Sequence, residues 1–520
     1  MSFPLGSTRP RRRVLAACLA VSLASGLGLA TAGAAVAAPP AGPASPAGPA
    51  APAAPGHAPA APGHAPALPV VAGPVMNYAV NVAKANPGQT KQAERAVVAA
   101  SGTVVASWPE IGVVIAQSSN TNFAPSLRAD KTVESVGATR TAPVTAADPT
   151  WKGAPAAAAP GTPGAASQQS VAEQEGVEAR SAVVADPLEA QQWDMTAIKA
   201  DQAHQVTDGS PRVLVAVLDS GIQGDHPDLA ANIDQRRSAG CLSGTPDSSY
   251  AAWQPTTSDH GTHVAGTIAA DRNGVGIVGV APASTLSAVK VVNDDGFIYA
   301  EAAICGFMYA QATGADVTNN SYFIDPWEFW CGSDVDQAAV KTAVDRAVQF
   351  TQRKGVVNVA AAGNSGVDLA NKTVDAGSPN DTVPVTRQLD ATCTDIPAEL
   401  DGVVTVASTT SAGAKSSFSN YGAGVIDVAA PGSSILSTVT GGGYGTKSGT
   451  SMASPHVAGV LALLASTHPR LEGSRLTDLL YAQADDVACP AAATTCVGTP
   501  ADNGWFGEGL VDALDAVTAR

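Results

Sequence analysis

The chain has 520 residues, of which 45% are hydrophobic and 14% are charged, and its formal net charge is −16 at pH 7. This length exceeds a typical single domain, and the apolar fraction is sufficient for at least one large core. The acidic balance argues against nucleic acid as a partner, because such binding depends on clustered basic residues.

The N-terminus has the pattern of an export signal. Arg9 and the arginines at 11–13 precede an alanine-rich apolar stretch over residues 14–38, and Ala35-Val36-Ala37 offers a cleavage site between small residues. We expect a signal peptide over residues 1–37 and a secreted, extracellular protein. A membrane anchor is the alternative, but Ser, Gly and Thr dilute the stretch, so no stable anchor is expected. Sec and twin-arginine export both remain open.

Cysteine usage agrees with export. Cys18 lies in the predicted signal peptide, and six cysteines follow it. An even number in an exported chain favours three disulfides over reduced, buried thiols, with fifteen pairings possible. Cys489 and Cys496 are the favoured pair because they close a short loop. The six are Cys241, Cys305, Cys331, Cys393, Cys489 and Cys496.

Two Ala/Pro/Gly-rich linkers, over residues 38–75 and 141–185, flank a small folded unit at 76–140. Its pattern predicts the order βαββαβ. The predicted strands cover 77–82, 103–108, 112–116 and 133–136, and the predicted helices cover 89–100 and 123–130. Residues 186–520 follow, with strand runs alternating with helices such as 337–353. This alternation predicts one large α/β domain, with a mostly parallel sheet and helices on both faces.

Three segments of the large domain carry the residue types of a nucleophilic site. Asp219 follows a continuous apolar run at 213–218, as expected for a strand buried on both faces. His260 precedes a helix of small residues. Ser451 precedes an apolar helix, whose N-terminal N–H groups and dipole would stabilise an oxyanion. The order Asp, His, Ser is one of the known orders of the catalytic triad.

Each segment also has a structural alternative. Gly449-Thr450-Ser451 makes an ordinary helix cap, and Asp219 could cap a turn. A lone histidine is more often structural than catalytic. His260 and His263 could suggest a metal site, but no third ligand with suitable spacing follows.

Together these segments resemble the three signatures of subtilisin-like serine proteases, the subtilases of peptidase family S8. The resemblance covers residues 186–520 and implies a three-layer subtilisin-like α/β fold. It implies a serine endopeptidase that hydrolyses peptide bonds through an acyl-enzyme intermediate. The three matching segments are Asp219-Ser220-Gly221, His260-Gly261-Thr262-His263 and Gly449-Thr450-Ser451-Met452-Ala453-Ser454-Pro455. The resemblance also includes the closing segment Gly507-Glu508-Gly509-Leu510-Val511-Asp512-Ala513.

The resemblance also implies roles for single residues. Asp219, His260 and Ser451 would be the catalytic triad, with the first histidine of the motif chosen over His263. Asn364 would be the side-chain donor of the oxyanion hole. Because this set is intact, the alternative of a catalytically silent peptide-binding protein on a subtilase scaffold is disfavoured.

The unit at 76–140 resembles the ferredoxin-like inhibitory propeptide of subtilases. This implies a monomeric proenzyme, or zymogen, that its own propeptide inhibits until it is cut within the second linker. The alternative is an accessory binding domain that the mature protein keeps.

By the same resemblance, Glu189, Asp228 and Asn273 fall on ligand positions of a structural calcium site. Oxygen donors from separate loops suit this hard cation. The alternative is a set of solvated surface residues.

Two segments are expected to bind the polypeptide substrate. Gly296, Phe297 and Ile298 form one edge, which could take a peptide as an added strand. Family members often have Ser-Leu-Gly-Gly in the opposite wall, where this chain has bulky residues in place of the glycines. Broad specificity is therefore not transferred to it. The opposite wall consists of Ser321, Tyr322, Phe323 and Ile324.

Overall fold

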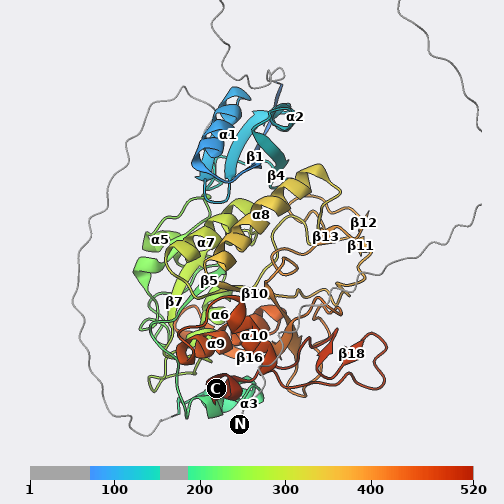
Figure 1. Cartoon of the computed structure of the whole chain (residues 1–520). Helices are drawn as coiled ribbons and strands as arrows, with labels where there is room; N and C mark the ends of the chain where they lie inside the picture. Colours follow the sequence, from blue (N-terminus) through green and yellow to red (C-terminus); the bar gives the residue numbers. More distant parts are fainter. Residues whose placement is uncertain (1–70, 153–184, 519–520) are drawn as a thin grey trace, which may run out of the picture. The chain divides into compact units, whose positions relative to one another are not determined.

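The computed structural model describes residues 71–152 and 185–518, which fall within one compact unit (Figure 1). The predicted signal peptide lies outside these residues, as do most of the two predicted linkers. Among the helices of the described ranges, none is long and apolar enough to cross a bilayer.

Residues 71–138 form an antiparallel four-stranded sheet in the order β2-β3-β1-β4. Val80, Val114 and Phe123 belong to the core that lies between this sheet and its two helices. The order of elements is the predicted βαββαβ, but the first strand begins five residues earlier than predicted. The elements are β1 (Ala72–Val82), α1 (Pro87–Ala99), β2 (Thr103–Trp108), β3 (Val113–Asn120), α2 (Phe123–Arg128) and β4 (Val133–Ala138).

The chain after β4 turns back along this unit. The amide of Val144 donates to the carbonyl of Val75 (2.8 Å), and Asn77 donates to the Thr150 hydroxyl (2.8 Å). The described structure therefore continues to Lys152, beyond the predicted boundary at residue 140.

The large domain is built on a seven-stranded parallel sheet, in the order β15-β14-β10-β8-β5-β7-β6. This sheet confirms the predicted α/β class. Its strands are β5 (Leu214–Asp219), β6 (Ala239–Gly240), β7 (Thr285–Lys290), β8 (Val317–Asn320), β10 (Val357–Ala361), β14 (Val404–Thr409) and β15 (Val428–Pro431).

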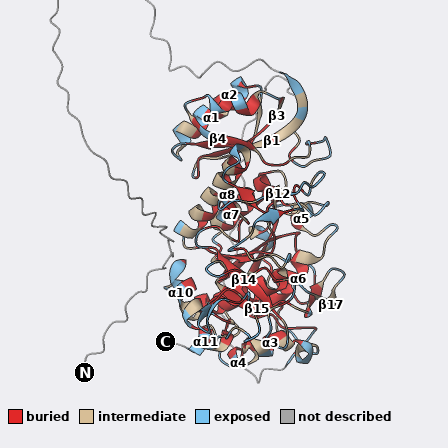
Figure 2. Ribbon diagram, turned by 90° about the vertical axis from the view of Figure 1, so that its right-hand side faces the viewer, coloured by how far each residue is buried: buried red, intermediate tan, exposed pale blue. Residues whose placement is uncertain are grey.

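Strand β5 explains why its sequence is apolar throughout. Val215 and Val217 enter one core, together with α6 (His260–Ala269) and α9 (Thr450–Thr467). Leu214, Ala216 and Leu218 enter the other, with α7 (Ala300–Ala312) and α8 (Val335–Arg353). Successive side chains of a strand point to opposite faces, so helices cover both faces of the sheet. Figure 2 shows the buried strands around β14 and β15.

Shorter elements and three disulfides complete the domain. Cys241–Cys305, Cys331–Cys393 and Cys489–Cys496 are bonded, which confirms the predicted number and the favoured pair. The shorter elements are η1 (Glu189–Gln191), α3 (Trp193–Ala197), α4 (Ala200–Ala203), η2 (Gln235–Arg237), α5 (Tyr250–Trp253), β9 (Trp330–Cys331), β11 (Val374–Asp375), β12 (Arg387–Gln388), β13 (Cys393–Thr394), β16 (Ile435–Val439), β17 (Gly443–Lys447), α10 (Ser474–Ala482), β18 (Gly498–Thr499), β19 (Asp502–Asn503) and α11 (Ala513–Thr518).

Candidate active site

The first part of the site forms where the end of β5 meets the start of α6. Asp219 is the last residue of β5 and His260 the first of α6. A Cβ at Gly261 would lie 2.4 Å from the carbonyl oxygen of Gly221, closer than any real Cβ contact. Glycine at 261 therefore lets the helix approach the strand closely enough for the two side chains to meet.

Asp219 holds one nitrogen of His260. The imidazole Nδ1 lies 2.9 Å from Oδ1 and 3.0 Å from Oδ2 of the buried carboxylate, which also accepts from the amide of Ser220 (2.7 Å). Burial lowers the pKa of His260, but the charge and hydrogen bond of Asp219 raise it more, so the net shift is upward. In the described ranges no residue bonds to Nε2, which is left to accept a proton.

Ser451 is the second residue of α9 and is half-buried. Its Oγ donates to the carbonyl of Ser321 (3.2 Å), and the Ser321 hydroxyl donates to the carbonyl of Ser451 (3.0 Å). The nucleophile candidate is thus bound to the predicted substrate wall, and its hydroxyl makes no hydrogen bond to His260 in this conformation.

Asn364 lies beside the same helix terminus. Its Oδ1 accepts from the amide (2.8 Å) and the hydroxyl (3.0 Å) of Thr450, the residue before Ser451. Because Oδ1 is engaged in this way, Nδ2 is the donor that remains near Ser451. It makes no hydrogen bond to any residue of the described ranges. The structure therefore places Asn364 against the residue that precedes Ser451.

A residue that the sequence did not single out holds the turn that carries Asn364. Asn420 accepts from the amides of Ser365 (3.1 Å) and Val367 (2.9 Å), and its Nδ2 donates to the carbonyl of Ala362 (2.9 Å). It lies in a loop without a periodic pattern, so only the tertiary structure reveals this role.

His263 has a structural role. It is buried, and its Nε2–H is shared by the carbonyls of Ile435 (3.0 Å) and Gly445 (3.2 Å), in the β16–β17 hairpin. Burial lowers its pKa to about 4, which keeps the ring neutral at physiological pH. This geometry separates it from His260.

The predicted substrate edge at 296–298 has little free hydrogen-bonding capacity. Gly296 and Phe297 donate to the carbonyl and side chain of Asn293, and Ile298 donates to the Asp325 carboxylate. All three N–H groups are thus used inside the protein, which leaves none for an added strand.

In the opposite wall, Ser321 touches Ser451, as described above, and Phe323 is half-buried. The Tyr322 ring is buried in the core, and its hydroxyl donates to Asn320 (3.0 Å). Tyr322 therefore supports this wall from behind.

The predicted calcium ligands have different partners. Glu189 accepts from Arg272 (3.1 Å), and Asn273 Oδ1 caps the amide of Val275 (3.0 Å). Asp228 accepts from the amide of Ile277 (3.0 Å) through Oδ2, but its buried Oδ1 has no partner.

Asp186 shares this pattern with Asp228. Its Oδ1 accepts from the amide of Gly274 (2.6 Å), and its buried Oδ2 has no partner. The two unsatisfied carboxylate oxygens suit a hard cation. In the described chain, however, no three His, Cys, Asp or Glu side chains gather closely enough to hold a metal by themselves. Backbone carbonyl or amide oxygens would have to complete the site.

Comparisons with known proteins agree with this geometry. Residues 210–509 match the family model described as the subtilase family. A subtilisin of Bacillus pumilus is 38% identical over 324 residues, which are 62% of this chain and 98% of that protein. Subtilisin E of Bacillus subtilis is 37% identical over 324 residues, which are 62% and 70% of the two chains.

The fold is also shared with a solved structure, the epidermin leader peptide processing serine protease of Staphylococcus aureus. The TM-score is 0.61 at 21% identity, and the match covers 86% of this chain and 98% of that one.

Proposed function

Because the chain belongs to the subtilase family of serine endopeptidases, we propose that Asp219, His260 and Ser451 are its catalytic triad. Asn364 supplies the side-chain donor of the oxyanion hole. The observation that carries this assignment is the contact of both Asp219 oxygens with His260 Nδ1, which leaves Nε2 free as a base.

The mechanism follows from these atoms. The Ser451 hydroxyl leaves the carbonyl of Ser321 by rotation about its Cα–Cβ bond and gives its proton to His260 Nε2 as it attacks the peptide carbonyl. Asp219 stabilises the imidazolium and fixes its orientation. The oxyanion accepts from Asn364 Nδ2 and from the amide of Ser451. His260 then protonates the leaving amine, and water hydrolyses the acyl-enzyme by the same steps in reverse.

Labelling with a fluorophosphonate probe tests this assignment. We expect a covalent adduct on Ser451 and hydrolysis of peptide substrates, both abolished in Ser451→Ala. Ser466→Ala, in the last turns of the same helix, is the matched control and keeps both. An absence of label on the processed protein would instead indicate the silent peptide-binding alternative.

We propose that residues 71–152 are an inhibitory propeptide, so that the chain is made as a zymogen. Support comes from the polar groups that this segment buries against the large domain. Asn77 donates to Glu301 on α7 (2.8 Å), and Asn81 donates to the carbonyl of Ala339 on α8 (2.8 Å). Arg346 on α8 donates to the carbonyl of Val82 (2.8 Å). Buried polar contacts of this kind favour a specific docked arrangement.

Arg140 adds a charged contact to this interface. It pairs with both Asp148 and Glu301, and its guanidinium stacks on Tyr299, 3.7 Å from the ring centre.

A secreted destination is consistent with the three disulfides, which persist in oxidising compartments.

Calcium binding near Asp228 is a further part of the proposal. Asp228 and Asp186 would supply the free carboxylate oxygens described above, and Asn273 would supply its amide oxygen. Bound calcium would tie the start of the large domain to the loop at 271–277.

A further inference from the structure

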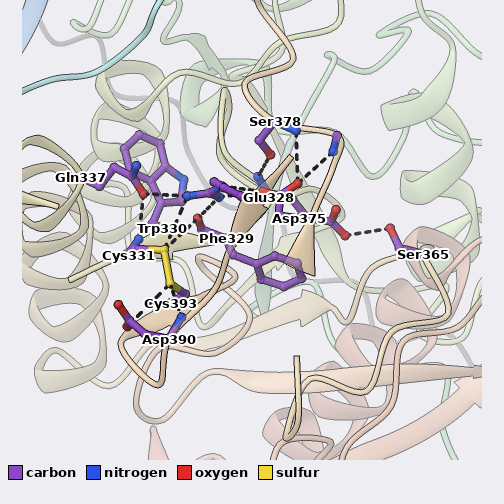
Figure 3. A network of polar contacts seen from close by, with 12 residues as sticks. Glu328, Phe329, Trp330, Cys331, Gln337, Ser365, Asp375, Ser378, Asp390 and Cys393 are labelled. Carbon is purple, nitrogen blue, oxygen red and sulfur yellow. Dashed lines mark hydrogen bonds and ion pairs between the residues drawn. A yellow bond between two sulfur atoms is a disulfide. The ribbon is translucent and has the colours of Figure 1, made fainter. Parts of the chain in front are cut away.

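Asp395 lies on a segment that the structure fixes firmly beside the catalytic groups. It follows β13, which pairs with β9 and is joined to it by the Cys331–Cys393 disulfide (Figure 3). The next residue, Ile396, accepts a hydrogen bond from the amide of Ile324 (2.9 Å), at the end of the substrate wall. The position of Asp395 is therefore coupled to the wall that touches Ser451.

The carboxylate also lies against the turn of the oxyanion donor. Its Oδ2 is 3.7 Å from the point where a Cβ on Gly363 would stand, and Gly363 precedes Asn364. The amide of Gly363 in turn donates to the Thr450 hydroxyl (3.1 Å). Asp395 therefore lies close to the turn that carries Asn364, and this turn is bonded to the start of α9, where Ser451 lies.

Within the described residues, Asp395 forms no ion pair. Asp395 is 2% exposed, and its Oδ1 has no hydrogen-bond partner in the described structure. Burying a carboxylate without a counter-ion is unfavourable, because the group loses its hydration without gaining a partner. The carboxylate is therefore the kind of group that a ligand of opposite charge would complete.

The groups that face Asp395 do not supply that charge. Two of them are carboxylates, Glu328 and Glu399. The neighbouring cation is Lys372, but its ammonium group already donates to Glu399 (2.6 Å) and to the carbonyl of Leu369 (2.8 Å). Burial, followed by the charges of Glu399 and Glu328, raises the pKa of Asp395 above the usual aspartate range, while Lys372 lowers it less.

Glu328 provides a second carboxylate that lies nearer the surface than Asp395. It is half-buried and accepts from the exposed Ser365 hydroxyl (2.7 Å), one residue after Asn364 (Figure 3). A metal ion is a poor fit, because the described residues gather no three metal-ligating side chains. A long organic cation could interact with both carboxylates in turn.

The substrate residue that Ser451 attacks must place its carbonyl oxygen at Asn364 and its backbone along Ser321. In that position its side chain would point toward the wall at 321–324 and the turn at 363–365, the two segments beside Asp395. We propose that Asp395, assisted by Glu328, selects substrates with lysine or arginine immediately before the cleaved bond. This inference rests on the proposed function and names the substrate class of the same site.

A series of peptide nitroanilides that differ only in the residue before the cleaved bond tests the proposal on the processed enzyme. We expect kcat/KM for arginine and lysine to exceed that for leucine and phenylalanine by about 100-fold, since a cationic side chain gains an ion pair with the carboxylate that an apolar side chain cannot form. Asp395→Asn should remove most of this preference, measured as the ratio of kcat/KM for arginine to kcat/KM for leucine. Asp486→Asn, an equal charge change at an exposed position, is the control and keeps the preference.

Inhibition of the unmutated enzyme by peptide aldehydes provides a readout that does not depend on folding of the variant. An arginine aldehyde should bind about 100-fold more tightly than the leucine aldehyde of the same length. Equal or better cleavage after apolar residues would overturn the inference, as would an arginine preference that survives in a folded Asp395→Asn. Normal fluorophosphonate labelling in either case would leave the proposed function intact, whereas absence of labelling would count against that function itself.

Discussion

Two histidines three residues apart on α6 behave as different chemical groups because their partners differ. Nδ1 of His260 faces the Asp219 carboxylate, which favours a positive ring. Nε2 of His263 faces two carbonyls in a dry environment, which favours a neutral ring that donates one proton. The same residue type thus provides a base at one position and a structural link at the other.

The first prediction concerns the acid limb of activity. His260 must be neutral to accept the Ser451 proton, and its pKa is raised, so kcat/KM should fall as the pH drops through a value above about 6.5. Asp219→Asn should move this limb to lower pH and reduce kcat by about 10⁴-fold. A pH profile of both enzymes measures the two effects. A limb that stays in place in the variant would contradict the assignment of Asp219 as the charge partner.

The second prediction concerns stability at low pH. The pKa of His263 is about 4 in the folded protein and about 6.5 in an unfolded chain, so the unfolded state binds the extra proton between these values. The resulting destabilisation is absent above pH 6.5 and grows to about 3 kcal/mol as the pH falls to 4. His263→Gln should remove this slope from urea unfolding measured over that range. If the free energy of unfolding differs between variant and wild type by the same amount at pH 7 and at pH 4, His263 is not the cause of the slope.

At the scale of elements, the site depends on how closely α6 approaches the end of β5. Gly261→Ala would place a methyl group 2.4 Å from the Gly221 carbonyl and push His260 away from Asp219. Because small displacements of catalytic groups cost about 10²-fold, kcat should fall by at least that factor while far-UV circular dichroism is unchanged. Gly377→Ala, where the nearest atom is 3.9 Å away, is the matched control. Full activity in Gly261→Ala would show that the helix tolerates a shift.

The loop at 271–277 carries the prediction for calcium. If the free oxygens of Asp186 and Asp228 bind the ion, chelation should lower Tm by several degrees, and Asp228→Asn should abolish this response. Asp225→Asn, on an exposed neighbouring carboxylate, should retain it. A Tm that is indifferent to the chelator in the wild type would remove calcium from the proposal.

The sequence predicts the elements with strong local patterns and misses groups that only tertiary pairing brings together. Asp219 and Ser451 adjoin long apolar runs, so their places at a strand end and a helix start follow from local pattern. Asn420 and Asp395 lie in irregular loops, where no periodicity indicates a partner. Their roles depend on distant contacts, such as the hydrogen bond between Ile324 and Ile396.

The same reasoning applies to the predicted substrate edge, whose internal hydrogen bonds the sequence does not reveal. The segment at 296–298 has the composition of an open strand, but its N–H groups bond to Asn293 and Asp325. Asp325 lies 27 residues from Ile298, too far along the chain for a local pattern to reveal the contact.

At the scale of the whole molecule, the N-terminal unit and the large domain are complementary at β4 and α8. A Cβ at Gly137 would lie 2.1 Å from the carbonyl oxygen of Asp336. Gly137→Ala should therefore loosen docking, and the unprocessed chain should hydrolyse a small chromogenic peptide about 10-fold faster than the unprocessed wild type. Glu110→Ala, on an exposed turn of the same unit, serves as the control.

Processing supplies a second control for this experiment. Once the N-terminal unit is removed, the two enzymes are identical, so their activities should become equal. An unprocessed wild-type chain that is already as active as the processed one would identify the unit as an accessory domain.

Removal of that unit would also change the electrostatics of the surface it leaves. Glu301 and Asp336 pair with arginines of the N-terminal unit, and Asp381 accepts from Thr141. Among the described residues, the reverse pairing involves only Arg346 with Glu134. The freed enzyme would present mainly negative charge there, and the released unit would carry the matching positive charge. Their re-encounter would be steered over a Debye length of about 8 Å at physiological ionic strength and slowed by added salt. Recapture of the mature enzyme by its own fragment would therefore weaken as the salinity of its surroundings rises.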